Sequence, residues 1–216
     1  GRMINSPNDY DVVIKLIPTK NDNFFVCMRL CSIQDNRFAY RKNVLPTSMH
    51  PSQAALIVSL AKPYLKETAQ IMDPFCGVGT LLIERAHLVP AREIYATDTY
   101  GDAITMGREN AAFAKTRINF IHRDFFDFRH DYKFDELITD MPVRNRQTKA
   151  EMELFYERFF DKAAEHLVSG GIIVMYSNEI GFVKKQIRLR VEYRLLQETC
   201  ILDKKDFYLF VIRYED

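Results

Sequence analysis

From residue 70 onward, short apolar runs alternate regularly with amphipathic segments. The runs QIMDPF, EIYATD, INFIHRD, DELITD and IIVMYS have the length of single strands, whereas TLLIERAHL and KAEMELFYERFFDKAAEHL have apolar residues at helical spacing. The last two runs, VEYRLLQETCIL and FYLFVIRYE, are separated only by the polar segment DKKD. Strand–helix alternation that ends in a hairpin predicts a doubly wound, three-layer α/β fold with a mostly parallel sheet and one antiparallel strand.

The first 48 residues follow another pattern. Residues 10–17 and 24–31 predict two strands around the polar turn TKNDN, and RFAYRKNVL predicts a third, short extended piece. A helix is expected from Pro51 to about Pro63, and the pair Gly170-Gly171 is expected to end the long helix before it. We therefore expect a small N-terminal extension of β-hairpin and helix over residues 1–48, and one larger domain over residues 49–216.

Composition narrows the class of protein. A net charge near +1 argues against a strongly basic nucleic-acid-binding protein, although local basic patches remain possible. No apolar run has membrane-spanning length and the N-terminus has no apolar signal core, so we expect a cytoplasmic protein with no membrane partner. The four cysteines are scattered, and Cys27 and Cys31 have no histidine or second cysteine pair nearby. We therefore expect reduced thiols and no metal site.

The segment DPFCGVGT, residues 73–80, predicts where a ligand binds. Gly77 and Gly79 let the backbone turn tightly and approach a ligand closely, and the turn follows a predicted strand, where open α/β sheets bind their ligands. The loop lacks the GKS/T ending of a phosphate-binding P-loop and carries an acid, Asp73, instead. An acid beside such a turn suits a cationic, hydroxyl-bearing cofactor, and S-adenosylmethionine fits that description.

Four acids close four successive predicted strands: Asp73, Asp98, Asp124 and Asp140. In a parallel sheet the four strand ends share one edge, so the carboxylates are expected to converge on one crevice. Each acid alone could equally be a helix cap or a turn former. Four acids at equivalent places favour a binding site.

Each acid has a chemical task in such a site. Asp98, at the end of the second strand, suits a bidentate hydrogen bond to ribose hydroxyls, and Asp73 can accept from the cofactor's ammonium group. Asp124 with Phe125 can bind adenine. Asp140 lies in ITDMPVRNR, a stiff loop that can position an amine nucleophile. Methyl transfer from a sulfonium needs in-line positioning and removal of one proton, and it requires no metal.

These residues resemble the class I S-adenosylmethionine-dependent methyltransferases, and more narrowly the RNA methylases that modify the N2 amine of guanine and often carry a THUMP RNA-binding domain. The similar segments are FAYRKNVLPTSMHPSQAALIVSLA, DPFCGVGTLLIERA, YATDTYGDAITMGRENAAFA, RDFFDF and ITDMPVRNR, which cover roughly residues 37–146 in the order found in the family. The resemblance implies a seven-stranded Rossmann-like sheet, S-adenosylmethionine as cofactor, and tRNA or rRNA as substrate. It implies catalytic roles for Asp140, Met141 and Pro142, and cofactor contacts for the following residues: His50, Asp73, Phe75, Cys76, Gly77, Gly79, Thr80, Asp98, Thr99, Asp124 and Phe125. For His50, a capping or packing role at the start of a helix is an equal alternative.

The catalytic loop departs from the N/D-P-P-Y pattern of the family. The first proline is Met141, the aromatic residue is Val143 and the glycine that normally follows is Arg144. Because the aromatic ring normally stacks on the target base, three explanations stay open: another ring such as Phe126 or Tyr156 stacks instead, the substrate differs, or activity is weak.

Two basic clusters flank the predicted active edge. They contain Arg37, Arg41 and Lys42 on one side, and Arg144, Arg146 and Lys149 on the other. They are either solvated loops or phosphate contacts, and we expect substrate contacts from Arg41, Val143, Arg144 and Arg146. An RNA-binding domain or subunit outside this chain is a further expected partner.

Two rival functions remain. One is methylation of a protein amide or a small-molecule amine, since related loops serve amide nitrogens. The other is a degenerate methylase fold that binds the cofactor or RNA without turnover, which the altered DMPVRN segment motivates. A nicotinamide-binding domain is disfavoured, because the turn lacks the third glycine of GxGxxG.

Overall fold

The computed structural model describes residues 6, 10–30, 36–202 and 206–216. It divides into two compact units, Gly1–Ala39 and Tyr40–Asp216, which are described separately. Most of the DKKD turn expected near the C-terminus lies outside the described residues, as does Cys31.

The first unit contains an antiparallel β-hairpin. Strands β1 (Val12–Pro18) and β2 (Phe24–Leu30) pair from Val12 opposite Leu30 to Pro18 opposite Phe24. The Thr19 N–H closes the turn on the Asn23 carbonyl at 2.8 Å. Large apolar side chains of both strands are exposed: Ile14, Leu16, Ile17, Phe24, Phe25, Val26 and Met28. A lone hairpin of this kind has little core of its own.

The second unit is built on a seven-stranded sheet in the order β5-β4-β3-β6-β7-β9-β8. Its strands are β3 Gln70–Asp73, β4 Glu93–Asp98, β5 Asn119–His122, β6 Phe134–Asp140, β7 Leu167–Ser177, β8 Tyr193–Leu202 and β9 Phe207–Tyr214. Strand β9 runs antiparallel to both of its neighbours, and the other pairs are parallel. The predicted doubly wound sheet with one antiparallel strand is confirmed.

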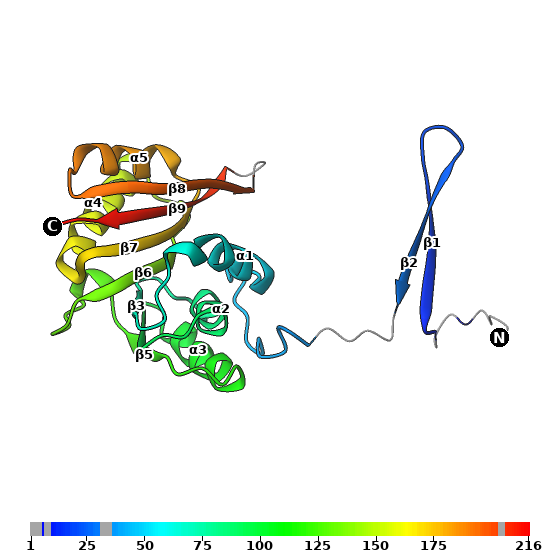
Figure 1. The fold of residues 1–216 in the computed structure, drawn as a ribbon, viewed down its shortest axis with the longest axis horizontal. Helices are drawn as coiled ribbons and strands as arrows, with labels where there is room; N and C mark the ends of the chain where they lie inside the picture. The colour runs from blue at the N-terminus through cyan, green and yellow to red at the C-terminus, as the bar shows by residue number, and fades with distance from the viewer. Residues whose placement is uncertain (1–5, 7–9, 31–35, 203–205) are drawn as a thin grey trace. The chain divides into compact units, whose positions relative to one another are not determined.

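Helices cover both faces of this sheet (Figure 1). The helices are α1 Pro51–Ala61, α2 Thr80–Leu88, α3 Gly101–Phe113, α4 Lys149–His166 and α5 Ile180–Leu189, with short 3-10 turns at Lys62–Tyr64 and Phe125–Asp127. Helices α1, α2 and α3 pack together, and α4 packs with α5. Thr148 caps α4 through a capping box with Glu151. In the described part of the chain, no helix is both long and apolar enough to cross a membrane.

A buried ion pair fastens α2 to the centre of the sheet. The Arg85 guanidinium contacts the Glu136 carboxylate of β6 at 2.9 Å, and both side chains are almost fully buried. Arg85 also donates to the carbonyls of Lys66 and Val89, and the Lys66 N–H donates to Glu136. Because every charge is compensated, this network fixes the C-terminal half of α2 against the sheet.

Two expected boundaries are wrong. Gly170-Gly171 do not end α4, which stops at His166; they lie inside β7, where the pairing with β6 shifts register and Gly170 has φ +78°. The glycines therefore accommodate an irregularity in a strand rather than a helix terminus. The segment RFAYRKNVL is not one extended piece either, because residues 37–40 form a turn.

Candidate active site

A cavity of about 570 Å³ lies at the carboxyl ends of the parallel strands. Its walls come from the turn after β3, the end of β4, the loop after β6, and a segment before α1. This volume lies within the range of about 300–1,000 Å³ that is usual for pockets that bind small molecules and cofactors. Three of the four predicted acids, Asp73, Asp98 and Asp140, line it, so the sheet edge brings them together as expected from the strand order.

The glycine turn forms the floor of this cavity. Asp73 accepts a hydrogen bond from the Phe75 N–H at 3.0 Å, and the Gly79 N–H donates to the Cys76 carbonyl at 2.8 Å. Gly77 and Gly79 have φ of +51° and +79°, which L side chains rarely adopt. A Cβ on Gly77 would meet no atom within 4 Å, so this peptide is open to a ligand.

Asp98 ties the glycine turn to the next strand. Its carboxylate accepts from the Gly77 N–H at 2.8 Å and from the Tyr100 N–H at 2.9 Å. Each oxygen keeps a further lone pair, so the same group can still accept from a ligand hydroxyl. Removing this carboxylate would therefore disturb both the turn and a bound ligand.

Burial sets the electrostatics of the cavity. Burial raises the pKa of Asp73 to about 8, and the nearby charges of Asp140 and Asp98 add to this, while hydrogen bonds from Phe75 and Thr139 oppose it. Burial also raises the pKa of Asp140 to about 7. Two carboxyls with raised pKa values favour a cationic ligand, whose charge would stabilise their ionised forms.

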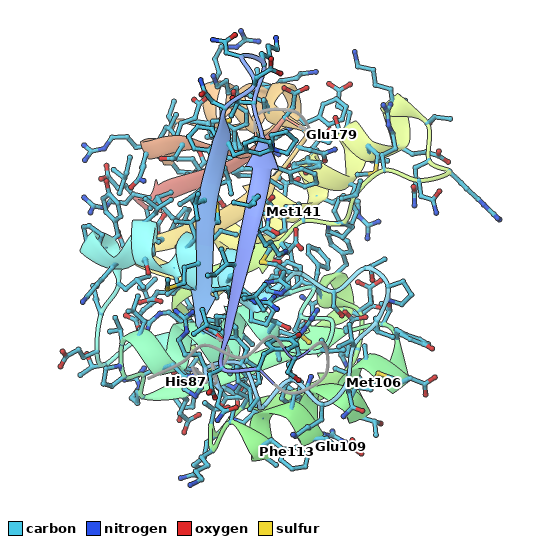
Figure 2. All side chains as sticks on the ribbon, turned by 90° about the vertical axis from the view of Figure 1, so that its right-hand side faces the viewer. His87, Met106, Glu109, Phe113, Met141 and Glu179 are labelled. Carbon is cyan, nitrogen blue, oxygen red and sulfur yellow. The ribbon has the colours of Figure 1, made fainter. Side chains whose placement is uncertain are left out.

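The loop after Asp140 forms another wall of the cavity. The Met141 side chain is buried, and its N–H donates to the Tyr176 carbonyl at 2.9 Å. Val143 lines the cavity and is 50% exposed. Arg144 also lines it, with its Nε 3.7 Å from the Glu179 carboxylate at the start of α5. Met141 and Glu179 are labelled in Figure 2.

The segment before α1 supplies a wall that the predicted site residues do not include. Leu45, Thr47, Ser48 and Met49 line the cavity. The amide of Asn110, on α3, holds this segment to the glycine turn by contacting the backbone of Lys42, Asn43 and Val78. The sequence signal that could have identified it is the LPTSMHP segment before the helix, which belongs to the family resemblance but has no acid.

Arg41 braces that same segment. Its terminal nitrogen donates to the carbonyls of Ser48 and Met49 at 3.4 and 3.1 Å, and Arg41 does not line the cavity. Arg146, the other basic residue expected to touch substrate, is exposed and also lies outside the cavity lining. A second contact ties the segment before α1 to α3. The Asn43 side chain donates to the Glu109 carboxylate at 2.6 Å, and Figure 2 labels Glu109 with Met106 and Phe113 on the same helix.

Several predicted cofactor residues do not line the cavity: His50, Gly79, Thr99, Asp124 and Phe125. His50 caps α1 through Ser52, and Asp124 caps the short 3-10 turn by accepting from the Phe126 N–H at 2.9 Å. The Phe125 ring is 1% exposed and packs in the core against Phe159. The structure therefore gives these three side chains capping or packing contacts.

The rings considered as base-stacking partners are occupied. Tyr156 is fully buried and its hydroxyl bonds Ser177 at 2.6 Å. Phe126 lies outside the cavity lining, and the Arg158 guanidinium covers one face of its ring at 4.1 Å. Cys76 lines the cavity, but burial raises the pKa of its thiol well above the usual value, which disfavours a thiolate nucleophile.

These residues fit S-adenosylmethionine. The buried acids suit its cationic groups, the open Gly77 peptide allows close approach, and Asp98 can still accept from ribose hydroxyls. The Thr80 hydroxyl, at the start of α2, lines the cavity and is buried without a hydrogen-bond partner among the described residues. Within the same residues, no three His, Cys, Asp or Glu side chains are grouped so that they could hold a metal ion.

Comparisons with known proteins agree with this geometry. The chain is 32% identical over 187 residues to a tRNA (guanine(10)-N2)-dimethyltransferase of Methanothermobacter thermautotrophicus, which covers 81% of this chain and 54% of that protein. It is 25% identical over 155 residues to a release factor glutamine methyltransferase of Lactococcus lactis, over 63% of this chain and 56% of that protein. The chain thus spans about half the length of these curated relatives.

Solved structures share the fold. The structure of TrmN from Thermus thermophilus matches with a TM-score of 0.74 and 19% identity, covering 97% of this chain and 61% of that one. Trm5 of Methanocaldococcus jannaschii, in complex with adenosine, matches with a TM-score of 0.59 and 19% identity over 78% of this chain and 51% of that one. The family model for RMKL-like methyltransferase domains matches residues 39–199. The chain therefore belongs to the family of RMKL-like methyltransferase domains, class I methyltransferases whose cofactor is S-adenosylmethionine.

Proposed function

We propose that this chain methylates the exocyclic N2 amine of guanine in a structured RNA, either tRNA or rRNA. The observation that carries the proposal is Asp140, a carboxyl with a pKa of about 7 that ends β6 and lines the same cavity as the glycine turn. The 32% identity to a tRNA guanine-N2 dimethyltransferase supports the choice of RNA and of the amine.

In this proposal Asp140 acts on the amine. Its ionised carboxylate accepts a hydrogen bond from the amine N–H, orients the nitrogen lone pair toward the cavity and takes up the proton that methylation releases. A pKa of about 7 suits a group that must bind a proton and give it up near neutral pH. The backbone carbonyl of Pro142, an exposed residue that lines the cavity, is a candidate second acceptor, since Met141 fixes the backbone before it.

The remaining residues hold the donor side of the reaction. S-adenosylmethionine, when bound, supplies a methyl group on a cationic sulfur. Asp98 and the Gly77 peptide hold its ribose side, and Asp73 faces its positive charge. The segment from Leu45 to Met49 closes the cavity from the side and limits the access of water.

The test uses the chain with labelled S-adenosylmethionine and total RNA, followed by nucleoside analysis. We expect label in N2-methylated or N2,N2-dimethylated guanosine. Asp140→Ala should lower turnover by about 10²- to 10⁴-fold, the usual contribution of a general base, and reduce cofactor affinity far less, because Asp73 and Asp98 remain in the cavity. Turnover that survives this substitution would contradict the role of Asp140.

A protein amide is a second candidate acceptor, because the chain also resembles a release factor glutamine methyltransferase. An extended amide could enter the same cavity. Such a substrate has no base to stack, so it does not need an aromatic ring at the position of Val143. Label that appears in the protein fraction of a cell extract and not in its RNA would favour this function. Tight cofactor binding with no label in either fraction would favour a scaffold without turnover.

RNA affinity is proposed to come partly from another domain or subunit. The net charge of +1 supports this, as do the exposed apolar residues of the hairpin, which include Phe25 and Met28. Filter binding of labelled tRNA to the chain alone should then be weak. Submicromolar affinity at 0.15 M salt would contradict it.

A further inference from the structure

We propose that the guanidinium of Arg144 provides the flat surface on which the target base stacks, in the place of the aromatic ring that the loop after Asp140 lacks. The inference deepens the proposed function and rests on it. It assigns to Arg144 a contact with the base itself, which differs from the phosphate contact that a basic residue in this loop suggests.

The position of Arg144 supports this role. Asp140, Val143 and Arg144 line the same cavity, so a base whose amine reaches Asp140 passes the side chains of the other two residues. Val143 is half exposed, but an isopropyl group offers no π face to a base. Arg144 follows it directly, is 46% exposed, and carries a planar, delocalised cation.

A chain of contacts holds the Arg144 side chain in place. Its Nε lies 3.7 Å from a carboxylate oxygen of Glu179, which is 19% exposed. The Glu179 N–H donates to the Ser177 hydroxyl at 3.0 Å, and this hydroxyl bonds the buried Tyr156 hydroxyl at 2.6 Å. This loose ion pair lies on the Nε edge of the guanidinium, so the two faces of its plane stay available to a base.

The other rings near the cavity leave this role open. Phe75 is the one aromatic residue among the described residues that line the cavity. It packs against Phe155 at a ring distance of 5.3 Å and against Phe125 at 6.0 Å, on the side of the glycine turn. The lining residues of the loop after Asp140 therefore include no aromatic ring, and Arg144 carries their one planar cation.

The chemistry distinguishes stacking from a phosphate contact. Unpaired RNA bases stack on aromatic rings or on arginine planes, and a lysine ammonium has no plane to offer. A phosphate accepts either residue, because lysine binds it as a point charge. Arg144→Lys therefore keeps the charge and removes the stacking surface.

The experiment measures methyl transfer from labelled S-adenosylmethionine to unmodified tRNA transcripts by the full chain. For Arg144→Lys we expect kcat/KM for RNA to fall about 5- to 150-fold, the range that stacking on one base provides, with cofactor affinity and thermal stability unchanged. The matched control is Arg188→Lys on the exposed side of α5, which should behave as the wild type. Adding Val143→Tyr to Arg144→Lys should restore most of the activity, since it returns a ring to the loop.

Glu179 is a positioning residue in this scheme. Glu179→Gln should lower kcat/KM for RNA severalfold in the wild-type background and have no effect in the Arg144→Lys background, because its action passes through Arg144. Equal losses in both backgrounds would contradict that role, since they would show an effect independent of Arg144.

The outcomes separate the two proposals. If the wild type methylates RNA and Arg144→Lys matches Arg188→Lys, stacking by Arg144 is overturned and the proposed function stands. If Arg144→Gln loses activity and weakens the salt dependence while Arg144→Lys does neither, Arg144 contacts phosphate and the stacking proposal is also overturned. If the wild type transfers no methyl group to any RNA, both proposals fail.

Discussion

Replacing Asp140 by asparagine should stabilise the cofactor-free protein while it removes the proposed base. Burial raises the pKa of this carboxyl from 3.8 to about 7, which corresponds to about 4 kcal/mol between its two protonation states. Linkage converts this shift into a loss of about 4 kcal/mol in the free energy of unfolding once the carboxyl is ionised. Asparagine has nearly the same shape and carries no charge.

The sign of the effect depends on pH. Between pH 4 and pH 7 the native state holds a proton on Asp140 that the unfolded chain has already lost, so the wild type loses stability as pH rises through this range. Asparagine does not titrate. The difference in the free energy of unfolding between Asp140→Asn and the wild type should therefore be near zero at pH 4 and reach about 4 kcal/mol above pH 7.

Urea denaturation at half-unit steps from pH 4 to pH 8.5, without cofactor, measures this difference. Asp131→Asn is the matched control, because Asp131 is exposed and lies outside the cavity. A difference for Asp140→Asn that stays constant across the range would refute the reasoning, since it would show that the carboxyl titrates alike in the folded and unfolded chains. Methyl transfer gives the second readout: below the pKa of Asp140 in the cofactor-bound protein, the wild-type kcat/KM for RNA should fall tenfold per pH unit, and any residual rate of Asp140→Asn should lack that break.

Two further substitutions test the cofactor wall. Asp98→Ala should weaken S-adenosylmethionine binding at least tenfold in calorimetry. The substitution removes the acceptor of the Gly77 and Tyr100 N–H groups and also the proposed acceptor for the ribose hydroxyls. Unchanged affinity would contradict the ribose role. Gly79→Ala should destabilise the fold by about 1–3 kcal/mol in denaturant titration, because its φ is +79° and the new Cβ would lie 2.8 Å from the Phe120 ring; a stability equal to the wild type would show that the turn can relax.

The sheet and its acid-bearing edge could be predicted because both depend on local pattern. Short apolar runs and helical spacing fix the order of elements, and a parallel sheet then sends every strand end to one edge. Asp73, Asp98 and Asp140 meet at the cavity for this reason. The role of Gly170 could not be predicted in this way. A glycine that ends a helix and a glycine at a register shift in a strand have the same local sequence pattern.

The walls of the cavity depend on contacts between distant parts of the sequence. Asn110 on α3 holds the backbone at Asn43, 67 residues away, and no local pattern predicts that bond. Phe125 was expected at the cofactor, but its ring is buried in the core. An aromatic residue after an acid has the same local pattern in both cases. Arg41 is basic and near the site, yet its guanidinium is used by the chain itself.

Two desolvated carboxyls at the cavity, Asp73 and Asp140, are unfavourable for the stability of the free protein, and ligand binding explains why the fold keeps them. Burial away from water is the main reason why the pKa of Asp73 rises to about 8, and the nearby charges of Asp140 and Asp98 add to that rise. A cationic ligand offsets this cost, because a positive charge in the cavity favours the ionised form of the buried carboxyl. Part of the free energy lost by burying Asp73 is then recovered when such a ligand binds, which selects for positive charge. Stability lost in the free protein is thus coupled to affinity for the sulfonium cofactor, and Asp140 is kept near its ionisation point, where it can exchange a proton with an amine.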